Sequence, residues 1–194
     1  MASPLASRIF GIAFTCTGLI ALASCDGAGS GSPGDAASNQ PFGSCSAGLD
    51  AGQACNAIRN VATAITPTCI SAPLPAGTGG TIAPGTYVLT AQTYHGTSAR
   101  CPTGSIASTL VLSGSCAQQV AQLAGMTFTT SMTIAVQGNQ VTLTSTCVNP
   151  SVSGLTFDTA TTTFTATPTT ITFFTVNSTV GNPNPDCAEV FVMQ

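Results

Sequence analysis

The most evident shortage in this sequence is charge. Only 5% of the 194 residues are charged, none of them is a lysine, and three arginines stand against six acidic residues. Nucleic-acid binding depends on basic side chains that neutralise phosphates, and docking on anionic lipid needs clusters of such side chains. The composition therefore argues against nucleic acid as a partner and against an electrostatic contact with a membrane surface.

The sequence also lacks the motifs of several common chemistries. There is no Cys-x-x-Cys and His95 is the only histidine, which argues against a zinc site and against a thioredoxin-like role. No Gly-x-Ser-x-Gly elbow occurs, and the glycines in residues 77–80 precede a predicted strand rather than a helix. The acids that could form a catalytic carboxylate pair are Asp50, Asp158, Asp186 and Glu189. We expect a non-enzymatic protein without metal or cofactor; the alternative is a surface hydrolase that uses His95 with an acidic residue.

An apolar segment occupies the N-terminus. Arg8 is followed by an uncharged run from Ile9 to Leu22, and the sequence Leu-Ala-Ser-Cys ends it at Cys25. A run of about 14 residues is too short to cross a hydrocarbon core of about 30 Å comfortably as a helix. Small residues just before a cleavage point are typical of an export signal. The segment is therefore predicted to be a signal.

The ending of this run resembles the lipobox of bacterial lipoproteins, in which a leucine and two small residues precede an acylated cysteine. The resemblance implies cleavage of a signal peptide at residues 1–24 and a palmitate-type lipid anchor on Cys25. It also implies a place in the bacterial cell envelope, at the periplasmic face or the cell surface. Cys16 fits the pattern less well, because Phe14 and Thr15 precede it. A plain secretory signal and a membrane helix are the alternatives.

Two further segments precede the strand-rich part of the chain. Residues 25–41 hold the lipid-bearing cysteine followed by small and polar residues, and we expect a flexible tether there. Residues 42–76 contain cysteines and a predicted short helix. Asp50 stands three residues before Gln53 as in a capping box, and Pro67 ends the helix. The apolar face of this helix would consist of Cys55, Ile58, Ala62 and Ile65.

Residues 77–194 are predicted to form the β domain, because threonine alternates there with aliphatic and aromatic residues. The clearest signal is a hairpin in which 132–137 and 140–146 flank a Gly-Asn turn. The other expected strands are 85–90, 109–112, 126–130, 155–160, 162–167, 169–176 and 189–193. A series of 7–8 strands without helices between them predicts an all-β antiparallel meander that closes as a small barrel. A β-sandwich is the alternative.

The β domain carries a second resemblance. Residues 79–87, Gly-Gly-Thr-Ile-Ala-Pro-Gly-Thr-Tyr, and the Glu-Val-Phe-Val of 189–192 resemble envelope lipoproteins of the myxobacterial type, which are similar to small lipocalin-like barrels. The resemblance implies a lipocalin-like barrel over residues 79–194. Lipocalins have Gly-x-Trp in their first strand, whereas this chain has Gly-Thr-Tyr at 85–87 and no tryptophan. The basic residue that lipocalins place near the last strand is also absent.

Nine cysteines are present, and seven remain if Cys16 leaves with the signal and Cys25 is acylated. In an oxidising envelope such cysteines form disulfides. The candidates are Cys45, Cys55, Cys69, Cys101, Cys116, Cys147 and Cys187. We expect two bridges among the last four and one among the first three. Since seven is odd, one thiol would be free or would pair with another chain.

The barrel interior is the remaining candidate site. The inward positions that could line a ligand cavity are Tyr87, Leu89, Leu110, Leu112, Phe128, Val141, Leu143, Phe164, Ile171 and Phe173. In a barrel of eight strands or fewer the same side chains can instead fill the interior as a packed core, and this reading is favoured. We therefore expect a lipid-anchored envelope lipoprotein that binds a small apolar ligand or an envelope protein. A structural or adhesive surface module is a further alternative.

Overall fold

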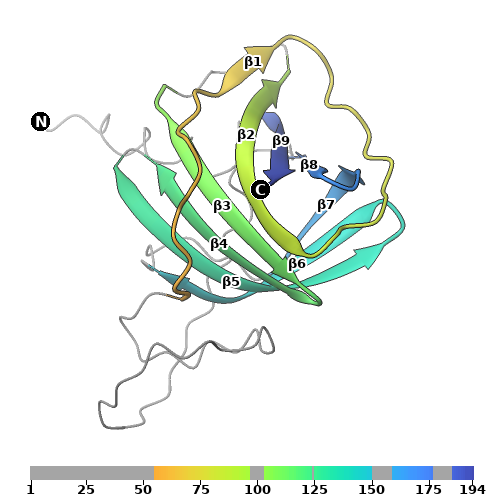
Figure 1. Ribbon diagram of the computed structural model, residues 1–194. Coiled ribbons are helices and arrows are strands. Elements are labelled where there is room, and N and C mark those ends of the chain that lie inside the picture. The colour runs from red at the N-terminus through yellow and green to blue at the C-terminus, as the bar shows by residue number, and fades with distance from the viewer. Residues whose placement is uncertain (1–54, 97–102, 124, 150–158, 177–184) are drawn as a thin grey trace, which may run out of the picture.

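The computed structural model describes residues 55–96, 103–123, 125–149, 159–176 and 185–194, which form nine strands and no helix (Figure 1). The strands are β1 (Thr68–Ile70), β2 (Gly85–His95), β3 (Ile106–Ser113), β4 (Cys116–Leu123), β5 (Met126–Gln137), β6 (Gln140–Asn149), β7 (Thr159–Ala166), β8 (Thr170–Thr175) and β9 (Asp186–Met193). Each strand from β2 to β9 pairs antiparallel with the next, and β2 also pairs with β9. Eight strands therefore close an antiparallel barrel, which confirms the predicted all-β barrel and not a sandwich.

The ninth strand, β1, completes the wall where β2 and β3 separate. The pairing of β2 with β3 ends at Val88, and further along β2 the parallel strand β1 takes the place of β3. Just before β1, Ile65 forms a two-way backbone bridge with Ile106 of β3. The chain from residue 65 to residue 70 therefore lies between the two separating strands and supplies hydrogen bonds to both.

The helix expected within residues 42–76 is absent from residues 55–67, the described part of its span. These residues instead run in extended form across the outside of β3, β4 and β5 (Figure 1). The Nδ2 of Asn56 donates to one carbonyl of β4 at 3.0 Å and one of β5 at 2.8 Å. The Nδ2 of Asn60 donates to a carbonyl of β3 at 3.0 Å. Hydrogen bonds to the barrel wall thus override the local helical pattern; residues 50–54, with the expected cap, lie outside the described residues.

Most strands lie where they were predicted, but two strands were not predicted and two predicted strands form a single one. The Gly-Asn hairpin is confirmed, with Gln137 paired to Gln140 across the turn. Strands β1 and β4 were not predicted. The expected strands 126–130 and 132–137 are one continuous strand, β5. Of the expected strand 155–160, only the last two residues are described, and they begin β7.

Candidate functional site

The ten predicted lining residues all lie inside the barrel wall and are buried. Nine of them belong to one core cluster, and Phe128 is buried as well. Phe173 packs edge-on against Phe191 with 5.9 Å between ring centroids. These two rings therefore occupy part of the barrel interior. A ligand role for the ten residues stays a prediction.

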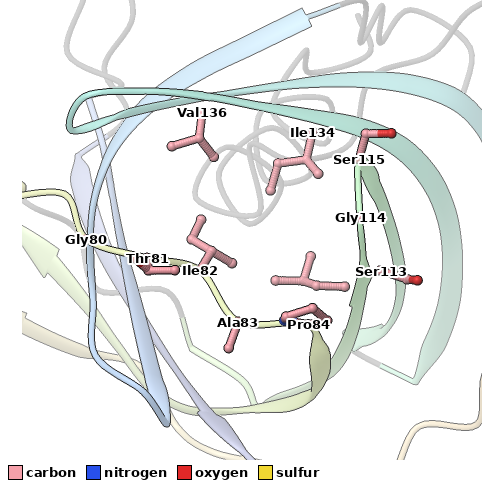
Figure 2. Close-up of a pocket in the computed structure, with 11 residues that line it drawn as sticks. Gly80, Thr81, Ile82, Ala83, Pro84, Ser113, Gly114, Ser115, Ile134 and Val136 are labelled. Carbon is pink, nitrogen blue, oxygen red and sulfur yellow. The ribbon is translucent and has the colours of Figure 1, made fainter.

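A pocket of about 550 Å³ lies at the end of the barrel where β2 begins (Figure 2). One wall is the segment 80–84, and the other is formed by the turn between β3 and β4 together with the far part of β5. The side chains of Ile82, Ile134 and Val136 converge on the space between these walls. Leu112 also lines it. None of the residues that line the pocket is charged. This pocket can accept an apolar group.

Residues 77–84, which we call the strap, are held against β7 by backbone contacts. The amide of Gly79 donates to the carbonyl of Phe164 at 2.7 Å, and the amide of Ala166 donates to the carbonyl of Gly79 at 2.9 Å. The Nδ2 of Asn139 donates to the carbonyl of Gly77 at 2.8 Å. A Cβ on Gly77 would lie 2.5 Å from the backbone nitrogen of Phe164. Only glycine therefore allows this close approach.

The other end of the strap is tied to the barrel interior. The hydroxyl of Tyr87 donates to the carbonyl of Ala83 at 2.7 Å, from a side chain that is otherwise fully buried. Ile82 packs against the core cluster. The strap is thus fixed at both ends, so one wall of the pocket is formed before any ligand binds. Pre-formed walls are a common property of ligand sites.

A second inward-facing set of side chains is polar, and sequence reasoning missed it. We call it the polar layer; its members are Gln92, Ser108, Gln119, Thr130 and Glu189, each at most 3% exposed. Side chains two apart on a strand share a face. Glu189 stands two residues before the core residue Phe191, and Ser108 stands two before Leu110. The polar layer therefore points into the barrel.

Hydrogen bonds connect members of the polar layer in two pairs. The Nε2 of Gln92 donates to Oε1 of Glu189 at 2.9 Å, between neighbouring strands β2 and β9. The Nε2 of Gln119 donates to the hydroxyl of Ser108 at 2.9 Å, between β4 and β3. The Oε1 of Gln119 is buried and has no hydrogen-bond partner. An orphaned buried acceptor is uncommon in native structures and calls for an explanation.

Burial determines the electrostatics of this layer. Desolvation raises the pKa of Glu189 to about 8, opposed in part by the hydrogen bond from Gln92. Burial and the nearby charge of Glu189 together raise the pKa of the Tyr94 hydroxyl. Arg59, the one arginine or lysine within the described ranges, is exposed on residues 55–67, which we call the outer segment. No cation of the described residues therefore neutralises Glu189.

The residues considered for hydrolysis are distributed over both faces of the wall. His95 and Asp186 are paired across β2 and β9. The ring Nδ1 of His95 hydrogen-bonds the carbonyl of Pro73 at 3.2 Å. Glu189 lies on the same strand as Asp186 but inside the barrel, and Asp50 and Asp158 lie outside the described residues. The structure thus brings His95 close to one predicted acid and leaves Glu189 apart from both.

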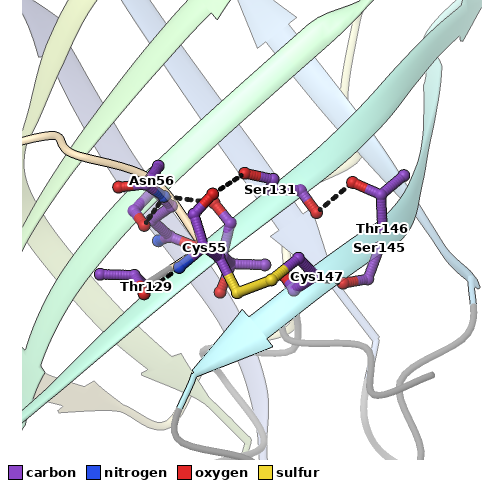
Figure 3. The surroundings of a disulfide bond; sticks show 9 residues. Cys55, Asn56, Thr129, Ser131, Ser145, Thr146 and Cys147 are labelled. Carbon is purple, nitrogen blue, oxygen red and sulfur yellow. Dashed lines mark hydrogen bonds between the residues drawn. A yellow bond between two sulfur atoms is a disulfide. The ribbon is translucent and has the colours of Figure 1, made fainter. Parts of the chain in front are cut away.

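The disulfide found in the described residues contradicts the predicted grouping, in which bridges form among the first three cysteines or among the last four but not between the two groups. Cys55 is bonded to Cys147 of β6, so a bridge joins the first group of cysteines to the last four (Figure 3). The reason is the extended path of the segment after Cys55, which lies on the outside of the barrel instead of folding on itself. Also disulfide-bonded are Cys69, Cys116 and Cys187. Cys25, Cys45 and Cys101 lie outside the described residues.

The described ranges contain neither a metal-binding cluster nor a membrane-spanning helix. No group of three or more His, Cys, Asp or Glu side chains in those ranges could hold a metal ion. Nor do those ranges contain a helix long and apolar enough to cross a membrane. The chain matches no family model, no curated protein and no solved structure.

Proposed function

We propose that this protein is a non-enzymatic, lipid-anchored envelope lipoprotein whose lipocalin-like barrel binds a small apolar ligand. The observation that carries the proposal is the pocket between the strap and the β3–β4 turn. Its volume of about 550 Å³ is in the range of small-molecule sites, and its aliphatic side chains come from three separate parts of the chain.

The energetics of this pocket suit a modest apolar ligand. Val136 is 49% exposed and Ile134 is half-buried, so both would lose water contact when a ligand binds. Each 100 Å² of apolar surface removed from water stabilises a complex by roughly 2.5 kcal/mol before the costs of association. The uncharged lining imposes no demand for a counter-ion. A compact hydrocarbon or aromatic group therefore fits this pocket better than a charged one.

The cysteines support a place outside the cytoplasm. All five cysteines in the described ranges are in disulfides, and such bonds persist in oxidising compartments. The lipobox-like sequence before Cys25 supports attachment through lipid. Together these features favour a folded barrel held at the envelope by its N-terminal end.

Binding at the pocket is tested with two matched variants. Native mass spectrometry of the purified full chain is expected to show a co-purified apolar molecule, and Val136→Asp is expected to lose it because a charge enters the pocket. Val61→Asp places the same charge at a 60% exposed position on the outer segment and should retain the ligand. Equal retention by both variants would contradict binding at this pocket.

The anchor is tested separately in cells. Radiolabelled palmitate should be incorporated into the wild-type chain and into Cys16→Ala, whereas Cys25→Ala should carry no label. Label retained by Cys25→Ala would overturn the lipoprotein assignment and leave the pocket proposal standing. The two experiments therefore fail independently.

A further inference from the structure

The barrel interior contains an acceptor and an acid that both need a partner. The Oε1 of Gln119 is orphaned, although the Gln119 side chain is only 3% exposed. Glu189 is 2% exposed and accepts one hydrogen bond, from Gln92, with no cation of the described residues beside it. An acid buried without a cation beside it stays protonated, and its carboxylate form would need an ionic partner. Both side chains point into the barrel interior.

We propose that the polar layer is a binding site for a primary amine in its ammonium form, with Glu189 as the counter-ion and Oε1 of Gln119 as a further acceptor. This site is distinct from the apolar pocket at the strap and does not depend on it. An ammonium group has three N–H donors and no acceptor. These donors match the carboxylate of Glu189, Oε1 of Gln119 and the hydroxyls beside them.

Several of the inward side chains at the level of the polar layer are small. Ser108, Thr130 and Ser145 are small, and the register places the last two beside Gln119 and Met132 on neighbouring strands. Eight-stranded barrels have an interior that side chains can just fill or that holds one small ligand. Hydroxyl-bearing residues of this size take up less of the interior than the phenylalanines and leucines of the core cluster.

Aromatic side chains next to Glu189 suit an organic cation. Phe173 is the cross-strand partner of Glu189, and Phe191 follows it on the same face of β9. The face of an aromatic ring attracts an ammonium group within about 6 Å of its centre. An amine that carries an apolar or aromatic tail could thus place its head at Glu189 and its tail against these rings.

Binding should be linked to proton release. The groups that face Glu189 from β2 are Gln92 and Tyr94, and those from β8 are Phe173 and Thr175. Tyr94 is the only titratable group in this set, and its pKa is raised, so it stays neutral. Without ligand, Glu189 is mostly protonated at pH 7 because its pKa is raised to about 8. An ammonium group requires the carboxylate, so binding expels the proton of Glu189.

The test compares 2-phenylethylamine with 2-phenylethanol on the full-length chain with its disulfides intact. Calorimetry near pH 6.5 in two buffers of different ionisation enthalpy should show release of close to one proton for the amine and none for the alcohol. The amine affinity should rise almost tenfold per pH unit below about pH 7.5. An amine that binds no more tightly than the alcohol, or that binds without proton release, overturns the proposal without any variant.

Variants then locate the site. Glu189→Gln keeps the shape of the side chain and can still accept from Gln92, and it should weaken amine binding about tenfold or more and abolish proton release. Asp186→Asn removes the same charge from the outer face of the same strand and should change neither quantity. Unchanged proton release in a folded Glu189→Gln, judged by circular dichroism, would also overturn the proposal. Gln119→Leu should weaken the amine severalfold and leave proton release intact.

Discussion

Cys55 and Cys147 are 92 residues apart in the sequence and are joined by a disulfide that fastens the outer segment to β6. Hydrogen bonds surround the bridge (Figure 3). The amide of Cys55 donates to the hydroxyl of Thr129 at 3.1 Å, and the hydroxyl of Ser131 donates to the carbonyl of Cys55 at 2.8 Å. The outer segment therefore belongs to the barrel's folded unit and does not merely precede it.

Removal of this bridge should destabilise the barrel. The double variant Cys55→Ala/Cys147→Ala frees a long loop in the unfolded chain and should lower the free energy of unfolding by about 2–4 kcal/mol. Urea unfolding, followed by the fluorescence of the two tyrosines, measures the change. Ser131→Ala, which removes one hydrogen bond and keeps the bridge, should cost about 1 kcal/mol. A double variant no less stable than Ser131→Ala would show that the bridge adds nothing to the fold.

Stability should fall as the pH rises, because of Glu189. Its pKa is raised to about 8 in the folded chain from an ordinary value of 4.5. Between these values the unfolded chain has lost this proton while the folded chain retains it, so the free energy of unfolding decreases by up to about 1.4 kcal/mol per pH unit. Below the lower value and above the higher one the slope vanishes.

Glu189→Gln should remove this slope, and urea unfolding at several pH values measures it. Asp186→Asn on the outer face serves as the control and should keep the slope. A wild-type chain whose stability is flat between about pH 5 and pH 8 would contradict the neutral, buried state assigned to Glu189.

The two buried glutamines should differ in their contribution to stability. Gln92→Met leaves Glu189 without its hydrogen bond and should cost about 2–3 kcal/mol, since the lost partner is an acid in an apolar setting. Gln119→Met removes an acceptor that has no partner in the structure, together with one hydrogen bond to Ser108. It should cost at least about 1 kcal/mol less. Chemical unfolding near neutral pH compares the two, and equal losses would show that Oε1 of Gln119 is satisfied in solution.

The barrel was predictable from the sequence where local signals are strong. The Gly-Asn turn and the alternating residues on either side of it define the β5–β6 hairpin without any long-range information. Strand β4 escaped detection because its inward residues are Ala117, Gln119 and Ala121, which lack the β-branched and aromatic character of a strand. Its position depends on pairing with β3 and β5, which no local pattern encodes. The outer segment shows the same limit, since partners on the barrel decide its conformation.

The candidate sites were predictable only in part. Leu112, which lines the apolar pocket, was expected inside the barrel. The strap that forms the opposite wall depends on contacts with β7, such as that of Thr78 with Thr165, 87 residues further along the chain. Glu189 had a readable signal: it shares the face of Phe191 in a strand whose residues from Cys187 onward are otherwise apolar. An acid at such a position indicates a buried carboxyl. Its partner Gln92 could not be deduced, because a bulge in β2 shifts the register there.

The strap should be sensitive to any side chain at Gly77. A Cβ there would lie 2.5 Å from the nitrogen and 2.6 Å from the oxygen of Phe164, both backbone atoms that cannot move aside cheaply. Gly77→Ala should therefore displace the strap from β7, lower the free energy of unfolding by about 1–3 kcal/mol, and reduce apolar ligand binding at the pocket. Gly125→Ala, on the turn between β4 and β5 and outside the pocket lining, is the control. Its Cβ would meet nothing within 4 Å, so the cost is limited to the strain of a φ of +82° and should be about 1 kcal/mol. Unfolding curves and native mass spectrometry compare the two variants, and ligand retained fully by Gly77→Ala would show that the strap does not shape the pocket.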